Sequence, residues 1–345
     1  MPEHELLKKL CLSCGISGEE EEVRELILSE IRPAAERWEI DPLGNLIVFK
    51  KGKKSPRRRL MLCAHMDEVG MIVTYITPEG LLKFDCVGGI HNSALFARQV
   101  LVGKNRVPGV VCAKPVHVAQ GDERKKCPSA KDLTIDIGAS TAEEAGAVVS
   151  VGDAVYFDAP YEEKGGFVIG KAIDDRLGCA VLIAMLQREQ PYDMTYVFTV
   201  REEIGLQGAA AAAFTVAPDD AIIVESTTAA DTPFAEGEQQ VCRVGEGAVV
   251  SLMDRSTIYD REYYDLAMKT AERIGVKAQT KTMIAGGNDA GAVHRSRGGV
   301  RTAAVSVPCR YLHGSSSLIA VSDAEAVAAL TEALAEAVLS RGEEE

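Results

Sequence analysis

Residues 60–73, LMLCAHMDEVGMIV, have the composition of a buried strand but carry His65, Asp67 and Glu68 in their middle. Burying an unpaired ionised group is expensive, so these side chains need partners or a chemical task. His65 and Asp67 are two residues apart and share one face of a strand. The Asp67 carboxylate can therefore accept the second imidazole N–H and fix the tautomer. We expect His65 to be a metal ligand and Asp67 to orient it.

Carboxylate or imidazole groups also follow four other apolar segments, namely Asp174 and Asp175 after GGFVIGKAI, Glu202 and Glu203 after TYVFTVR, Glu225 after AIIV, and His313 after VSVPCRYL. A single acidic residue at a strand end usually begins a turn or caps a helix, as Asp174 and Asp175 can. So many carboxylates together could not stay ionised side by side without cations between them. The pattern therefore indicates a cation site rather than a set of unrelated turns.

Two histidines and several carboxylates suit a pair of divalent ions, zinc or cobalt, about 3.5–4 Å apart and bridged by a carboxylate and a water. The sequence has no H-E-x-x-H motif. That absence argues against a single-zinc protease whose ligands lie on one helix.

The segments that must position these groups alternate between two periodicities. Apolar runs predict strands over 37–40, 45–50, 59–64, 195–200, 221–226, 278–284 and 301–307, and helical spacing predicts helices over 5–14, 19–35, 174–189, 206–214, 261–275 and 323–340. This alternation predicts an α/β fold with a mixed, largely parallel sheet and helices on both faces. Ligands of such sheets bind beyond the carboxyl ends of the strands, where the candidate ligands lie.

Residues 68–165 differ from the rest of the chain. Short runs rich in Val and Ile are separated by Gly, Pro and Asp, and no amphipathic helix is obvious. We expect a small β-rich domain inserted into a catalytic domain made of residues 1–67 and 166–345.

Charge and cysteine usage narrow the class of protein. The net charge is −13, from 38 basic and 51 acidic residues, which argues against a nucleic acid or an anionic membrane as partner. No run reaches the ~18 apolar residues of a membrane span, and the charged N-terminal segment lacks a signal-peptide core, which favours the cytoplasm. The basic run 50–59 predicts a solvated hairpin loop. Nine scattered cysteines indicate reduced thiols, and Cys11 and Cys14 lack the second pair of a zinc site.

Five motifs connect these observations: AHMDEVGMIV, GKAIDDRLG, TVREEIGLQGA, GGNDAGAV and RYLHGSS. Their order and spacing resemble the tetrahedral aminopeptidase family of di-metal exopeptidases, which includes glutamyl, deblocking and lysyl aminopeptidases and cellulase M-like members. The resemblance runs nearly end to end, from GISGEE through DPLGNLIV to HGSSS.

The resemblance implies two divalent ions per subunit, zinc or cobalt, and a role for each candidate residue. Glu202 would be the general base that activates a metal-bridging water, and Asp174 would bridge the ions. The full set of implied metal ligands is His65, Asp174, Glu203, Glu225 and His313. The substrates would be short peptides with a free N-terminus. The insert would be a dimerisation domain, and dimers could build a tetrahedral dodecamer.

Three positions depart from the family pattern. Glu225 stands where relatives have Asp, Asn288 stands where they have Thr, and no acidic residue follows His313 in GSSSL. Asp231 lies close to Glu225 in sequence, but it belongs to another loop, so Glu225 is the expected ligand. Asp289 is expected to be a helix N-cap.

The role of His117 and the type of reaction stay open at this point. His117 resembles a position that reaches a neighbouring subunit's active site, although a structural role is preferred. The same metal site could serve an amidohydrolase or deacylase with a blocked or non-peptide substrate. Loss of one ion through Glu225 would leave a catalytically impaired oligomeric scaffold. A glycosidase is disfavoured because it would need only a carboxylate pair and would leave both histidines unused.

Overall fold

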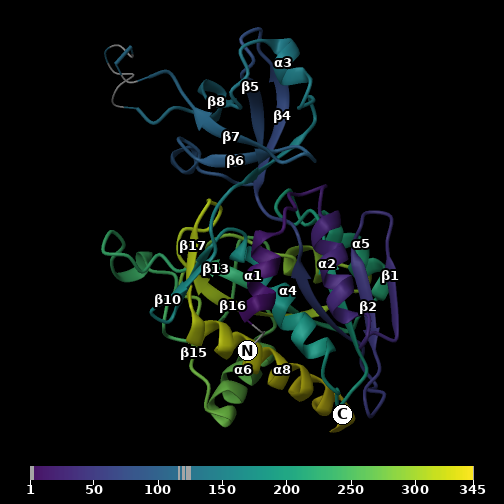
Figure 1. The fold of residues 1–345 in the computed structure, drawn as a ribbon. Coiled ribbons are helices and arrows are strands. Elements are labelled where there is room, and N and C mark those ends of the chain that lie inside the picture. Colours follow the sequence, from purple (N-terminus) through teal and green to yellow (C-terminus); the bar gives the residue numbers. More distant parts are fainter. Residues whose placement is uncertain (1–3, 116, 119–120, 122–125, 345) are drawn as a thin grey trace.

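The computed structural model describes residues 4–115, 117–118, 121 and 126–344, and it divides into two bodies (Figure 1). A small β body stands above a larger α/β body. Both chain ends lie in the larger body. The chain therefore leaves the larger body, builds the β body and returns.

The larger body is built on an eight-stranded sheet with the order β1-β2-β12-β3-β13-β16-β14-β15. Its central pairs are parallel, whereas β1 with β2, β2 with β12 and β14 with β16 are antiparallel. The strands are β1 (Arg37–Ile40), β2 (Leu46–Lys50), β3 (Leu60–His65), β12 (Met194–Thr199), β13 (Asp220–Thr228), β14 (Ala248–Val250), β15 (Ala278–Thr280) and β16 (Arg301–Cys309). The predicted mixed, largely parallel sheet is confirmed.

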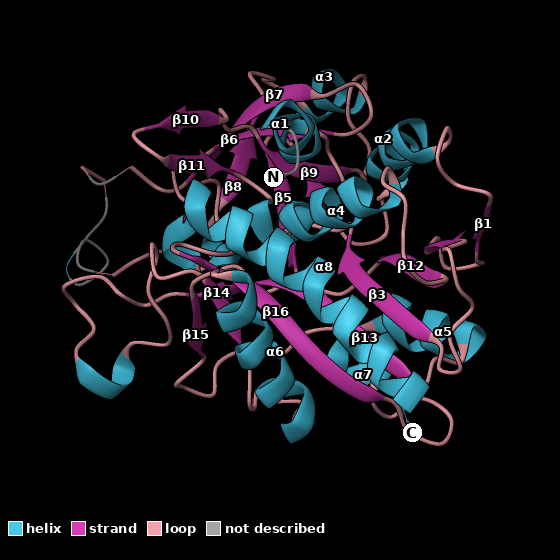
Figure 2. Ribbon diagram, turned by 90° about the horizontal axis from the view of Figure 1, so that it is seen from below, coloured by secondary structure: helices cyan, strands magenta, loops and turns pink. Residues whose placement is uncertain are grey.

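Helices cover both faces of this sheet, as predicted. One face carries α1 (His4–Leu12), α2 (Glu21–Ile31), α4 (Ile173–Leu186), α6 (Arg261–Ile274) and α8 (Val321–Glu344), of which α4, α6 and α8 lie across the strands in Figure 2. The other face carries α5 (Gln207–Val216) and α7 (Ala290–Val293). No helix within the described ranges is long and apolar enough to cross a membrane.

The smaller body is a closed barrel with the strand order β4-β5-β8-β7-β6-β9. Its elements are β4 (Gly70–Ile76), β5 (Leu82–Val87), η1 (Asn92–Ala94), β6 (Gln99–Val102), β7 (Val107–Cys112), η3 (Ala130–Asp132), β8 (Thr134–Asp136), α3 (Ala142–Gly146) and β9 (Ala154–Phe157). Closure pairs the strands that would otherwise be open edges. No sequence pattern predicted α3, because five residues are too few to show helical periodicity. Thr141 caps this helix by accepting the Glu144 N–H.

A three-stranded sheet, β10-β11-β17, lies beside the larger body. It consists of β10 (Glu162–Lys164), β11 (Phe167–Gly170) and β17 (Ser317–Ala320). The chain therefore leaves the barrel after β9, several residues before the expected boundary at 165. A further short element, η4, spans Gly237–Gln239.

Two sequence predictions are wrong in detail. Residues 50–59 form a connection but not a hairpin loop, because β12 lies between β2 and β3, and Arg58 makes a two-pronged ion pair with Asp220. The strand predicted over 278–284 ends at Thr280. Thr282 instead donates its N–H to the carbonyl of Val241, outside the sheet.

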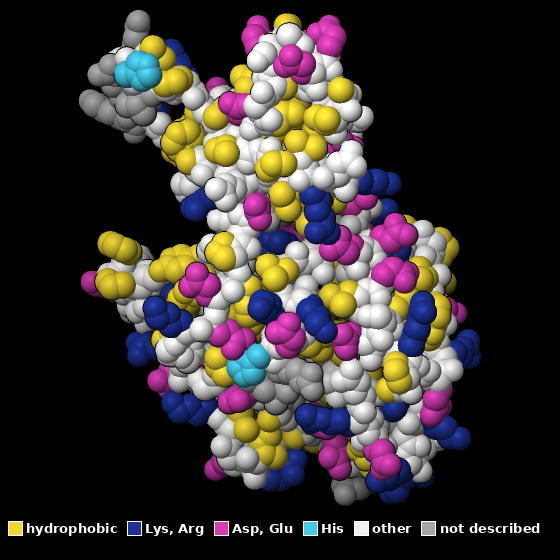
Figure 3. Space-filling view, in the orientation of Figure 1, with side chains coloured by type: hydrophobic (Ala, Val, Ile, Leu, Met, Phe, Trp, Pro, Cys, Tyr) yellow, Lys and Arg dark blue, Asp and Glu magenta, His cyan; other side chains and the backbone are white. Residues whose placement is uncertain are grey.

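Charges of both signs are intermingled over the surface of the larger body (Figure 3).

All nine cysteines are free, and Cys11 and Cys14 are buried. Burial raises the pKa of Cys11 to about 12. These thiols are therefore part of the packing, as the sequence indicated, and not a redox pair.

A buried cation links the N-terminal segment to the end of β3. Arg176 is fully buried in α4. Its guanidinium donates to the carbonyls of Leu10 (2.6 Å), Met66 (2.8 Å) and Gly15 (3.3 Å). Because Met66 lies between His65 and Asp67, this one side chain holds the end of β3 in place.

We predict that Arg176→Met destabilises the protein by roughly 3 kcal/mol or more, because buried carbonyls lose their donors. The free energy of unfolding from denaturant titration measures this. Arg188→Met is the matched control, because Arg188 makes an exposed ion pair with Glu332, worth at most about 1 kcal/mol. Equal losses for the two variants would contradict the anchoring role.

Candidate metal centre

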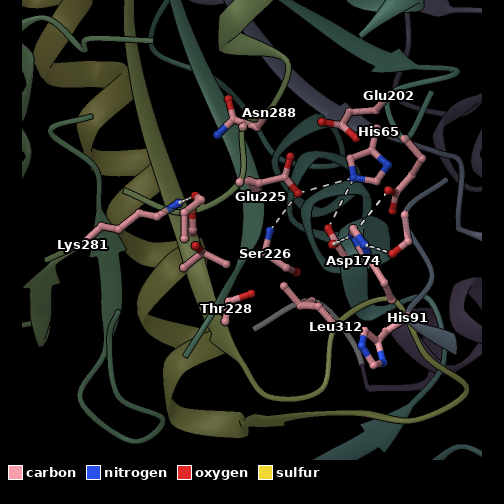
Figure 4. Close-up of a pocket in the computed structure, with 18 residues that line it drawn as sticks. His65, His91, Asp174, Glu202, Glu225, Ser226, Thr228, Lys281, Asn288 and Leu312 are labelled. Carbon is pink, nitrogen blue, oxygen red and sulfur yellow. Dashed lines mark hydrogen bonds and ion pairs between the residues drawn. The ribbon is translucent and has the colours of Figure 1, made fainter. Parts of the chain in front are cut away.

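Six of the seven predicted site residues line one cavity of about 420 Å³ (Figure 4): His65, Asp174, Glu202, Glu203, Glu225 and His313. They come from segments far apart in sequence: His65 ends β3, Glu202 and Glu203 follow β12, and Glu225 lies in β13. These strands are adjacent and parallel, so their carboxyl ends meet at one edge. Asp174 lies at the start of α4.

Asp174 is central in this arrangement. Its Oδ1 lies 3.3 Å from Nε2 of His65, and its Oδ2 lies 3.4 Å from Nε2 of His313. Glu225 Oε1 lies 3.4 Å from His65 Nε2, and Glu203 Oε2 lies 3.3 Å from His313 Nε2. Three groups of possible metal ligands result. Two of them, His65–Asp174–Glu225 and Asp174–Glu203–His313, share the Asp174 carboxylate, and the third is His65–Glu202–Glu203. The longer Glu225 side chain thus reaches the cluster, whereas Asp231 pairs with Arg310.

The donor set fits divalent cations because of the histidine tautomers. Nδ1 of His65 lies 2.9 Å from the main-chain oxygen of Asp67, and Nδ1 of His313 lies 3.0 Å from that of Gly89. A carbonyl only accepts, so each Nδ1 carries the proton and each neutral ring turns the lone pair of Nε2 toward Asp174. Asp174 Oδ1 is buried without a hydrogen-bond partner. Facing lone pairs repel unless a cation lies between them.

Without metal, protons take the place of that cation. Burial lowers the pKa of His313, but the nearby carboxylates of Asp174 and Glu203 outweigh burial and raise this pKa to about 9. Burial and the Asp174 charge raise the pKa of Glu203 to about 7, and burial raises the pKa of Glu225 to about 8. The positive charges of protonated His313 and His65 outweigh burial and lower the pKa of Asp174. Metal binding must displace protons from the histidines, so apparent metal affinity should rise with pH.

Asp67 is placed differently from the expectation. Its main-chain oxygen, and not its carboxylate, makes the short contact with His65; the carboxylate Oδ1 is 3.5 Å from Nδ1. The carboxylate accepts the N–H groups of Glu202 (3.0 Å) and Glu203 (3.1 Å) and the hydroxyl of Ser17 (2.6 Å). Asp67 therefore fixes the backbone that carries the two glutamates.

Asp289 occupies the N-cap position of α7, as predicted, but its side chain makes no capping hydrogen bond. The side chain of Asn288 takes the available donor, the N–H of Ala290, at 2.9 Å. The Asp289 carboxylate turns inward and accepts the Thr199 hydroxyl at 2.5 Å. It thereby contacts the end of β12.

Among the residues of the cavity wall that sequence reasoning missed, Lys281 and His91 carry ionisable side chains. Lys281 stood in a segment predicted to be a strand, and His91 stood in the insert, so no local pattern pointed to the site. His117 is exposed and does not line this cavity.

Comparison with known proteins decides the family. Residues 44–330 match the family described as M42 glutamyl aminopeptidase. The chain belongs to this family. The resemblance seen in the sequence is thus confirmed, and the protein is a peptidase, a hydrolase of peptide bonds.

Individual relatives extend over the whole chain. A protein of Acetivibrio thermocellus, provisionally named an aminopeptidase, is 39% identical over 96% of this chain and 98% of its own. The crystal structure of a TET aminopeptidase from Thaumarchaeota archaeon SCGC AB-539-E09 matches with a TM-score of 0.92 and 34% identity, covering 96% and 94% of the two chains. Pyrococcus horikoshii TET1 peptidase, which can assemble into a tetrahedron or a large octahedral shell, matches with a TM-score of 0.85 and 36% identity, covering 96% and 98%.

We predict that the wild-type protein binds two zinc ions per chain and that Asp174→Asn loses most of both, because Asp174 belongs to both donor groups. Glu203→Gln should weaken one ion only. Metal content after dialysis, measured by plasma mass spectrometry, checks this. Asp231→Asn is the control and should keep two ions, because Asp231 is held by Arg310 outside the cluster. Two ions retained in Asp174→Asn would refute the bridging arrangement.

Proposed function

We propose that this protein is a two-metal aminopeptidase that removes the first residue of short peptides. The observation that carries the proposal is the pair of donor groups joined by Asp174 at the cavity. His65, Asp174 and Glu225 would hold one divalent ion, and Asp174, Glu203 and His313 the other. When bound, zinc or cobalt ions supply Lewis-acid polarisation of the scissile carbonyl and lower the pKa of water.

Glu202 is the proposed general base. It lines the cavity, and Asp67 holds its main-chain N–H. Burial raises the pKa of its carboxyl well above the usual range, and a higher pKa makes the carboxylate a stronger base toward a bound water. Glu202 takes a proton from the attacking water and delivers it to the leaving amine.

The restriction to the first residue follows from charge. Carboxylates of Glu202, Glu203 and Glu225 lie together in the cavity, so a protonated or metal-bound α-amino group fits there. An acetylated N-terminus has lost both charge and basicity. Free N-termini should therefore be required.

Lys281 indicates the preferred first residue. Its ammonium donates to the carbonyl of Ala285 at 2.6 Å, and it forms no ion pair with a carboxylate of the described residues. Burial lowers the pKa of this amine, so a counter-charge would stabilise it. In Figure 4 it approaches the cavity from the side opposite His65. An acidic side chain of the substrate's first residue supplies the missing charge.

We further propose that the chain forms a homo-oligomer, from a dimer up to a dodecamer, with the barrel as its dimerisation domain. The similarity to the shell-forming TET1 peptidase supports this.

We predict that zinc- or cobalt-loaded protein shortens only free-ended members of a short-peptide library in which every peptide is also present acetylated. Mass spectrometry of the incubated mixture gives the result. Processing of acetylated peptides alone would show a deacylase. No processing at full metal occupancy would show a catalytically impaired scaffold.

We predict that Lys281→Met lowers kcat/KM for peptides beginning with Glu or Asp by about tenfold or more, because a charge-assisted hydrogen bond is lost. Peptides beginning with Ala or Leu should change far less. Steady-state kinetics on matched peptides measures the difference. Lys277→Met is the control, because Lys277 is exposed and pairs with Glu246. Equal effects on acidic and apolar first residues would contradict the assignment.

A further inference from the structure

One segment of the barrel reaches the candidate metal centre. It runs from Gly88 to His91, between β5 and η1. The carbonyl of Gly89 accepts the Nδ1 proton of His313 at 3.0 Å, and His91 lines the cavity. The barrel therefore forms part of the site wall as well as a separate body.

This segment packs closely against Val69 of the barrel core and Glu203 of the larger body. Gly88 has a φ of +83°, and a Cβ atom at this position would lie 2.7 Å from Val69 Cγ1 and 3.3 Å from Glu203 Cβ. Only glycine fits such an approach without displacement of its neighbours. The close contact fixes the start of the segment, and His91 follows three residues later.

Hydrogen bonding sets the state of the His91 ring. Nδ1 accepts the main-chain N–H of Ser93 at 3.3 Å, as the cap of η1, and lies 2.8 Å from the Ser93 hydroxyl. Since Nδ1 is used as an acceptor, the neutral ring carries its proton on Nε2. No described residue accepts a hydrogen bond from that nitrogen. His91 thus brings an unused donor to the cavity.

The donor is at the mouth of the cavity and not at its base. His91 is exposed, whereas Glu225 and Ser226, which line the same cavity, are buried. In Figure 4 His91 and Lys281 lie on different sides of the drawn side chains. If the first side chain of the substrate points toward Lys281, the remainder of the peptide leaves past His91.

We propose that Nε2–H of His91 donates a hydrogen bond to the main-chain carbonyl of the substrate's second residue and so positions the peptide beyond the scissile bond. A main-chain carbonyl is present whatever the sequence, so this contact would hold different peptides alike. The inference rests on the proposed aminopeptidase function.

Two substitutions of His91 distinguish the role of Nδ1 from the role of Nε2. In His91→Asn the amide oxygen can replace Nδ1 as the cap of η1, but nothing replaces Nε2. In His91→Gln the amide N–H can replace Nε2, and the cap is lost. Each variant is assayed on the tripeptide Glu-Ala-Ala and on glutamyl-p-nitroanilide, which lacks the second carbonyl. Zinc content is measured for every variant.

We expect the ratio of kcat/KM for the tripeptide to that for the anilide to fall about fivefold in His91→Asn, mostly through KM, as for one lost hydrogen bond. In His91→Gln the ratio should stay within about twofold of wild type. Calorimetric binding of the tripeptide to Glu202→Gln protein, with and without His91→Asn, should show the same weakening without turnover.

An unchanged ratio in His91→Asn would overturn the proposal. So would an equal fall in both variants, because it would assign the effect to the η1 cap or to packing. Wild-type protein that cleaves neither substrate would instead overturn the proposed function, and the inference with it.

Discussion

The two-sided contact of Asp174 is the constraint on which the site depends. One carboxylate faces Nε2 of His65 and Nε2 of His313, and main-chain carbonyls behind both rings force the lone pairs inward. The end of β3, the start of α4 and the turn between β16 and β17 must therefore meet at one point. Asp175 accepts the Gly178 N–H at the start of the regular part of α4. Arg176, in the same turn, donates a hydrogen bond to the carbonyl of Met66. Burying so much negative charge is tolerable only when protons or cations at its centre offset it.

The barrel begins close to this point in the chain. β3 ends at His65 and β4 begins at Gly70, so the barrel starts within a few residues of a candidate ligand. The carbonyl of Gly89 then returns to orient the second histidine. The barrel, which we propose to be a dimerisation domain, thus contacts a residue of the candidate metal centre directly. An oligomer contact that shifted the barrel would shift His313 as well.

The two sides of the cavity are built differently. The ligand side rests on adjacent parallel strands whose ends are fixed by backbone pairing. The Lys281 side rests on loops, and there the side chain of Asn288 donates to the Tyr259 hydroxyl (3.0 Å), which donates to Asp254 (2.5 Å). Rigid strands suit a common reaction, and loops accept changes in residue type and length. The wall proposed to select the first residue can therefore vary while the ligand side stays the same.

The sequence alone determined the fold class. It also predicted six of the residues that line the cavity, because apolar strands that end in His, Asp or Glu are a local pattern. It could not determine how Asp67 and Asp289 act, since both bind groups far along the chain. Lys281 and His91 entered the site only through the tertiary structure. Both are single polar residues in irregular segments, and loops carry no periodicity that reveals their direction. The tertiary structure also decided the histidine tautomers, because main-chain carbonyls orient both rings. Every residue type has a main-chain carbonyl, so no sequence pattern reveals which carbonyl will face a ring.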